Sequence, residues 1–187
     1  MNISYTKIDP AGNITVIVDS FVPREQQSRV ASELMKRDVT VEQVGFLEKP
    51  DDPCCAVRLQ MMGGEFCGNA SLSAAAVIFS RAGLGKGLYC EELFEVSGAP
   101  EPVKISGHMV NSACFEGEVA MPLPESISEC SFLDGFEGYT FPLVRFPGIC
   151  HAIVPAGAIN PERAEAVIAS WCRQLSADAL GLMFFDR

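Results

Sequence analysis

The segment Gly63–Phe79, GGEFCGNASLSAAAVIF, constrains the fold of this chain more than any other part of the sequence. From Ala70 onward its side chains are small or apolar on every side of a helix, with three consecutive alanines at 74–76. A helix without a polar face is normally buried, and small side chains let neighbouring strands approach it closely. Residues 70–83 are therefore predicted to form a helix that a sheet surrounds.

The segments on both sides of this helix carry strand patterns and short turns. Before it, strands are predicted at residues 3–8, 14–18, 39–48 and 54–62, with a Pro-Ala-Gly-Asn turn after the first and an amphipathic helix at 24–37. After it, further strands are predicted at 87–96, 101–111 and 114–123. Because neighbouring strands with short connections pair antiparallel, the predicted fold class is α+β, a mostly antiparallel sheet curled around the buried helix.

The remainder of the chain predicts a second, smaller unit. Residues 121–138 are rich in Pro, Ser and Gly and are predicted as a linker between a first domain at 1–120 and a second at 139–187. A strand, a turn and a strand follow at 139–155, and Asn160 and Pro161 are expected as N-cap and first residue of a helix. The last apolar run, 179–187, is strand-like with no later segment to pair with, so the second domain is expected to be incomplete, as in a truncated chain.

Composition excludes several classes of function. The 24 acidic and 14 basic residues give a formal charge of −10, which opposes binding to nucleic acid. The N-terminus has no signal-peptide pattern and no apolar run is long enough to span a bilayer, so a cytoplasmic protein without a membrane partner is expected. The eight cysteines contain no CxxC pair, and most are expected to be inert, buried thiols. No metal site is predicted, and nothing suggests PLP or nicotinamide as cofactor.

One of the eight cysteines, Cys67, has a setting that favours reactivity. It lies between a glycine-bearing loop and the predicted helix start, where unpaired N–H groups and the helix dipole stabilise an anion. The thiolate of Cys67 would be stabilised there, and the same amides could hold a substrate carboxylate. Gly64 and Gly68 allow close approach of the backbone to a ligand, and Asn69 is expected to cap the helix or to bind the ligand.

Three motifs in order resemble the diaminopimelate epimerase superfamily: YTKIDPAGNITVIVD, CGNASLSAAA and FPGICHAIVP. The resemblance implies PLP-independent racemisation or epimerisation of a small amino acid. In this chemistry a thiolate and a thiol act on opposite faces of the α-carbon and exchange their roles at each turnover. By resemblance, Cys67 is the first catalytic cysteine, the amides of Gly68 and Asn69 hold the α-carboxylate, and the side chain of Asn13 contacts the substrate.

The sequence also departs from that family. The second cysteine of the family lies in another Cys-Gly turn at a helix start, a position that neither Cys150 nor Cys172 matches. The turn before His151 is Gly-Ile-Cys where diaminopimelate epimerases typically carry Gly-Asn-Pro, and the loop before Cys67 is shorter than theirs. A substrate other than diaminopimelate is therefore expected. His151 itself is expected to be a satisfied structural residue.

Two alternatives remain open from the sequence. An isomerase of the phenazine-biosynthesis type, with the same fold, would use the carboxylate of Glu65 in place of a thiol, although a carboxylate beside a helix start is more often a favourable dipole partner. A noncatalytic chain would only bind a small carboxylate or associate with another subunit. The sequence is also compatible with a homodimer.

Overall fold

The computed structural model describes residues 2–83, 87–134, 137–146, 148–177 and 179–186. The chain divides into two compact units, Met1–Met121 and Pro122–Arg187. Each unit has its own hydrophobic core, and each is described by itself. Within the described residues, no helix has the length and apolar character needed to cross a membrane.

The first unit is built on a seven-stranded sheet whose strands are ordered as they occur in the chain, β1 to β7. Four of the six strand pairs are antiparallel, and β2–β3 and β4–β5 are parallel. The two parallel pairs are those whose connections contain helices, α1 and α2, as a parallel crossover requires. The predicted mostly antiparallel α+β fold is confirmed. The elements are β1 Tyr5–Ile8, β2 Thr15–Val18, α1 Arg24–Arg37, β3 Gln43–Glu48, β4 Val57–Met61, α2 Gly68–Arg81, β5 Cys90–Val96, β6 Val103–Asn111 and β7 Cys114–Val119.

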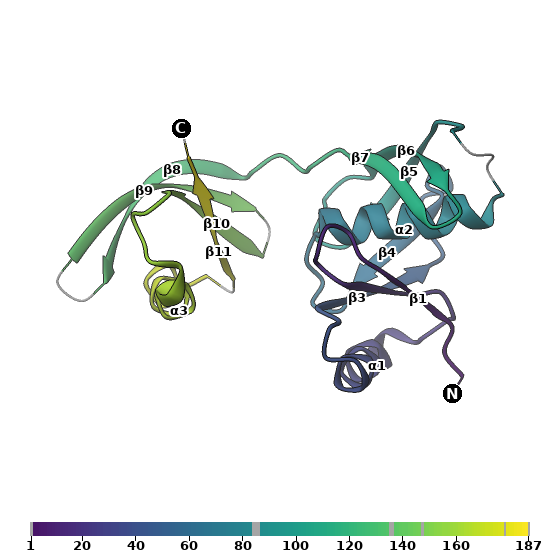
Figure 1. The fold of residues 1–187 in the computed structure, drawn as a ribbon, viewed down its shortest axis with the longest axis horizontal. Helices are drawn as coiled ribbons and strands as arrows, with labels where there is room; N and C mark the ends of the chain where they lie inside the picture. The colour runs from purple at the N-terminus through teal and green to yellow at the C-terminus, as the bar shows by residue number, and fades with distance from the viewer. Residues whose placement is uncertain (1, 84–86, 135–136, 147, 178, 187) are drawn as a thin grey trace. The chain divides into compact units, whose positions relative to one another are not determined.

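Helix α2 lies within the curve of this sheet, and α1 lies on the other side of it (Figure 1). The alanines Ala70, Ala74 and Ala75 are completely buried, because their small side chains let the strands pack closely around the helix. Large side chains from the strands, among them Leu59 and Phe94, fill the core around them. The predicted burial of this helix is confirmed.

The second unit is a four-stranded sheet in the order β11-β10-β9-β8, packed against helix α3. Trp171 of α3 is completely buried, and its indole stacks on the ring of Phe132 with 4.1 Å between the ring centroids. The side chain of Asn160 accepts a hydrogen bond from the backbone of Glu162, so it caps a 3-10 turn that leads into α3. The elements are β8 Ser126–Asp134, β9 Glu137–Phe146, β10 Ile149–Pro155, the 3-10 turn Pro161–Arg163, α3 Ala164–Leu175 and β11 Leu180–Phe185.

One local prediction for the second unit is wrong. Residues 121–138 were expected to form a linker, but strand β8 occupies Ser126–Asp134 and pairs with β9. Its pattern is weak because the face that carries buried Phe132 otherwise presents serines and a cysteine. The last apolar run, for which the sequence offers no later segment to pair with, forms β11 and pairs parallel with β10, which precedes it in the chain. Helix α3 provides the crossover between these two strands.

Candidate active site

The Cys67 thiol caps helix α2. Cys67 has extended backbone angles, and its sulfur accepts a hydrogen bond from the backbone N–H of Ala70 at 3.4 Å. Its carbonyl oxygen accepts the first helical hydrogen bond, from the N–H of Ser71 at 2.9 Å. The helix thus begins at Gly68, two residues before the predicted start. The expectation that Asn69 caps the helix is wrong, because Asn69 lies inside its first turn.

The backbone amides of Gly68 and Asn69 are the first two of the helix and have no partner within it. They point out of the positive end of α2, next to the thiol of Cys67. On one side the helix start faces Met121 and Val119, and a Cβ on Gly68 would be in ordinary van der Waals contact with them, at 3.4 Å from Met121 Sδ and 3.6 Å from Val119 Cγ1. The amides of this first turn are of the kind that binds an anion.

Two residues that the sequence analysis did not single out, Thr15 and Gln43, hold the Cys67 thiol. The thiol donates to Gln43 Oε1 at 3.0 Å, and Gln43 Nε2 donates to Thr15 Oγ1 at 2.7 Å. The two residues face each other at the first pair of the parallel strands β2 and β3, and both are buried. The available signal was a polar side chain at the start of each of two strands whose next three residues carry no polar side chain.

Asn13 belongs to the same network through its backbone. Its carbonyl oxygen accepts a hydrogen bond from Thr15 Oγ1 at 3.0 Å. Its side-chain Oδ1 is buried and has no hydrogen-bond partner among the described residues. A buried amide oxygen without a hydrogen-bond partner costs desolvation free energy. A donor group of a ligand could supply the missing hydrogen bond to this oxygen. The structure thus brings Asn13, predicted from the sequence, and Cys67 into one connected set.

The loop that leads to Cys67 is fixed from strand β5 and the turn that follows it. Ser97 Oγ donates to the carbonyl of Glu65 at 2.9 Å and accepts from the N–H of Met61 at 2.9 Å. The next residue, Gly98, has a φ of +74° and lies directly under the loop, so that a Cβ there would be only 2.6 Å from the carbonyl carbon of Glu65. Neither Ser97 nor Gly98 is predicted from the sequence, because their contacts with this loop join distant segments.

Three residues of the second unit were considered from the sequence, Cys150, Cys172 and His151. The two cysteines have ordinary packing roles, and His151 is the exception. Cys150 is buried and accepts a hydrogen bond from Arg145 Nη1 at 3.4 Å, and Cys172 is half-buried on α3. His151 packs edge-on against Phe146, and burial lowers the pKa of its imidazole. Its Nδ1 is buried without a partner among the described residues, which contradicts the expectation of a satisfied structural histidine.

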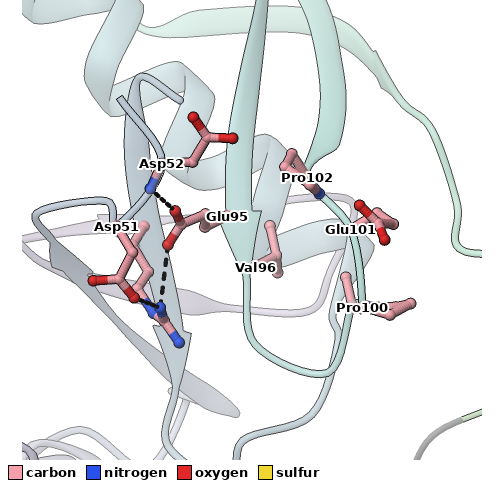
Figure 2. A pocket seen from close by; sticks show the side chains of 9 residues that line it. Asp51, Asp52, Glu95, Val96, Pro100, Glu101 and Pro102 are labelled. Carbon is pink, nitrogen blue, oxygen red and sulfur yellow. Dashed lines mark hydrogen bonds and ion pairs between the residues drawn. The ribbon is translucent and has the colours of Figure 1, made fainter. Parts of the chain in front are cut away.

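Pockets in the first unit lie at two places on its surface. A pocket of about 750 Å³ lies along one side of α2, between β1 and the β6–β7 hairpin, and Asn69 is among the residues that line it. Another, of about 350 Å³, lies beside β5, where the guanidinium of Arg58 bonds the carboxylates of Asp51 and Glu95 (Figure 2). Neither pocket is lined by Cys67. Within the described residues, no group of three or more His, Cys, Asp or Glu side chains is placed to hold a metal ion.

The sequence matches known racemases over nearly its whole length. Residues 2–187 match the family model described as the histidine racemase CntK N-terminal domain. The chain is 33% identical over 193 residues to a histidine racemase of Fusobacterium nucleatum subsp. nucleatum, covering 99% of this chain and 68% of that protein. It is 27% identical over 193 residues to a histidine racemase of Staphylococcus aureus, covering 98% of this chain and 67% of that protein.

Solved structures show the same fold in other racemases and epimerases. A hydroxyproline epimerase from Agrobacterium vitis, with bound trans-4-hydroxy-L-proline, superposes with a TM-score of 0.64 and 13% identity over 89% of this chain. A predicted epimerase from Pseudomonas aeruginosa gives a TM-score of 0.61 and 15% identity over 97% of this chain. The match spans 56% of the hydroxyproline epimerase chain and 70% of the Pseudomonas chain. The predicted fold family is confirmed.

Proposed function

The chain belongs to the family of the histidine racemase CntK N-terminal domain, and we propose that it supplies one half of a cofactor-independent amino-acid racemase site. Cys67 is the acid/base residue of this half. The observation that carries the proposal is the thiol at the N-cap of α2, bonded to the N–H of Ala70 beside the free amides of Gly68 and Asn69. A base and an anion-binding site therefore share one helix start.

In the proposed reaction, a proton is removed from one face of the α-carbon and another is delivered to the opposite face. The amides of Gly68 and Asn69 bind the α-carboxylate. The thiolate of Cys67 takes the α-proton, so that the C–H bond breaks and an S–H bond forms, while an acid on the opposite face delivers a proton to the same carbon. The bound carboxylate accepts part of the developing negative charge, which the fixed amides stabilise. The diaminopimelate epimerase resemblance implies a second cysteine as the opposing acid.

Histidine is the substrate that we propose first. The support comes from the relatives, which are histidine racemases and whose matches cover 99% and 98% of this chain. The side chain of Asn13, whose Oδ1 is buried without a partner among the described residues, is the proposed contact to the substrate, through an N–H donor such as the α-ammonium group. Diaminopimelate is not proposed, in agreement with the departures seen in the sequence.

The isomerase alternative has less support in the structure. Glu65 lies two residues before the helix cap, and its carboxylate is turned toward the backbone of Gly63, where a Cβ would overlap it. Cys67 occupies the cap with its sulfur bonded on both sides. The thiol is therefore the better-placed acid/base group, and the noncatalytic alternative is decided by the experiment that follows.

The test is exchange of the α-proton in D₂O. The full-length protein is incubated with L-histidine or D-histidine, without added PLP, and α-deuteration is followed by NMR beside chiral chromatography. The wild-type protein should deuterate and invert both enantiomers, and Cys67→Ser should lose at least about 100-fold of the rate. Cys54→Ser is the matched control, because Cys54 is an exposed thiol of the same unit.

The outcomes separate the candidate functions. Equal rates in Cys67→Ser and Cys54→Ser would contradict the proposed role of Cys67. Loss of proton exchange in Glu65→Gln, with an unchanged rate in Cys67→Ser, would support the isomerase alternative. No exchange with any amino acid, together with binding of a small carboxylate by calorimetry, would support a noncatalytic chain.

We also propose that the protein acts in the cytoplasm. All eight cysteines are free in the structure, which fits a reducing compartment. A homodimer is proposed as the assembly to test, and sedimentation velocity of the full-length protein measures it directly.

A further inference from the structure

The carbonyl oxygen of Asn13 determines which group donates and which accepts in each hydrogen bond of the chain that leads to Cys67. The chain of contacts runs from Cys67 to Gln43, from Gln43 to Thr15, and from Thr15 to the carbonyl oxygen of Asn13. A carbonyl oxygen only accepts, so the hydroxyl proton of Thr15 must point to Asn13. The hydroxyl oxygen of Thr15 then faces Gln43 as an acceptor.

This direction determines which end of the Gln43 carboxamide faces the sulfur. The NH₂ group of Gln43 must donate to Thr15, because the hydroxyl proton is already used. The carboxamide oxygen is thereby turned to Cys67 at 3.0 Å from the sulfur. An oxygen acceptor at that distance forms a hydrogen bond with a thiol, S–H, and repels a thiolate.

We infer that Thr15 is a positioning residue that biases Cys67 toward its thiol form by fixing the carboxamide of Gln43. The hydroxyl of Thr15 is not available to a substrate, because it donates its proton to Asn13 and accepts from Gln43. It acts through Gln43, and the set Thr15–Gln43–Cys67 is called here the thiol relay. The relay opposes the start of helix α2, where the N–H of Ala70 and the helix dipole favour the thiolate.

This opposition has a function if Cys67 exchanges acid and base roles, and to that extent the inference rests on the proposed function. A two-base racemase needs each of its acid/base groups as a proton donor in one direction and as an acceptor in the other. A helix start by itself favours an anion over a neutral group, and the anionic form serves in only one direction. The acceptor supplied by Gln43 brings the two forms closer in free energy.

The experiment measures alkylation of Cys67 by iodoacetamide at neutral pH, with the exposed thiol of Cys54 as internal reference, by mass spectrometry of peptides. In Thr15→Val the carboxamide is free to rotate and can donate from Nε2 to the thiolate. Alkylation of Cys67 should then be about fivefold faster than in wild type, the factor that corresponds to a hydrogen bond of about 1 kcal/mol. Thr15→Ser keeps the hydroxyl and should restore the wild-type rate within about twofold.

A second substitution distinguishes the relay from simple loosening of the loop. Gln43→Met removes the acceptor and offers no donor in its place, so its rate should lie between wild type and Thr15→Val. A rate in Thr15→Val no faster than wild type would overturn the inference, as would a Gln43→Met rate equal to or above that of Thr15→Val. Where Thr15→Val does not fold, as judged by circular dichroism, a Gln43→Met rate equal to wild type overturns it. The alkylation rates are measured without substrate turnover, so they test the inference even if the racemase assay shows no activity.

Discussion

Substitution of Gly98 by alanine tests the link between the loop and the Cys67 site. The residue has a φ of +74°, a conformation that side chains other than glycine rarely adopt. Its added Cβ would overlap the backbone of Glu65 and Phe66, the two residues before Cys67. Neither is a flexible side-chain end, so the loop itself must move. Gly83→Ala is the matched control, because Gly83 has a φ of +65° and a Cβ there would have no atom of the described residues within 4 Å.

The magnitudes of the two changes can be separated. An alanine in the left-handed region costs about 1–2 kcal/mol, and this is the whole effect expected for Gly83→Ala. Gly98→Ala adds the displacement of a packed segment, for which overpacking in protein cores costs about 1–3 kcal/mol. The expected loss of unfolding free energy for the first unit is therefore about 2–5 kcal/mol, and the hydrogen bond from Ser97 Oγ to Glu65 should weaken.

The assay has to report the first unit alone. The only tryptophan of the chain, Trp171, lies in the second unit, so its fluorescence serves as an internal control that should be unchanged in both variants. Hydrogen exchange of the amides in α2 and β4 measures the first unit, and alkylation of Cys67 measures the site. Protection in Gly98→Ala within about 0.5 kcal/mol of that in Gly83→Ala, with an unchanged rate at Cys67, would refute the reasoning.

Three further predictions concern the second unit. Trp171→Ala should destabilise it by about 3–5 kcal/mol in urea unfolding followed by circular dichroism, because a buried, stacked side chain is removed. Asn160→Ala should cost about 0.5–2 kcal/mol by Trp171 fluorescence, and Asn160→Asp should retain most of the cap; equal losses in the two would contradict the capping role. Burial lowers the pKa of His151 in the folded protein, so the unfolded chain binds a proton at this side chain more readily. The free energy of unfolding of the second unit should therefore be unaffected by His151 above about pH 6.5 and should decrease as the pH falls from there through the folded pKa. His151→Gln should flatten this pH dependence, and an unchanged dependence would exclude His151 as its source.

The sequence predicts best where a pattern is local and strong. The bounds of α1 are those predicted, and the burial of α2 follows from alanines that no surface helix would need. The place of Cys67 at a helix start is predicted because a helix start is visible in the sequence. The thiol as cap, in place of Asn69, was not predictable from capping preferences, because cysteine is not among the residues that usually cap a helix.

What the sequence does not predict depends on contacts between distant segments. Thr15 and Gln43 are 28 positions apart, and they meet only because β2 and β3 pair in parallel with these two residues in register. Gly98 and Ser97 support the loop before Cys67 from the turn after β5, a strand that follows α2. No single window of the sequence contains these contacts, so the Cys67 loop is recognisable from the sequence while its supports are not.

The same connection occurs in both units, and the comparison shows what is specific to the relay. In each unit an antiparallel pair is followed by a helix and then by a strand parallel to the second strand: β1–β2–α1–β3 and β9–β10–α3–β11. At the first pair of the parallel register, the first unit has Thr15 opposite Gln43, whereas the second has Cys150 opposite Leu180. An apolar pair therefore satisfies the scaffold at this position. The scaffold thus does not require polar side chains here, and the hydrogen bonds of the buried pair Thr15–Gln43 lead to the thiol of Cys67.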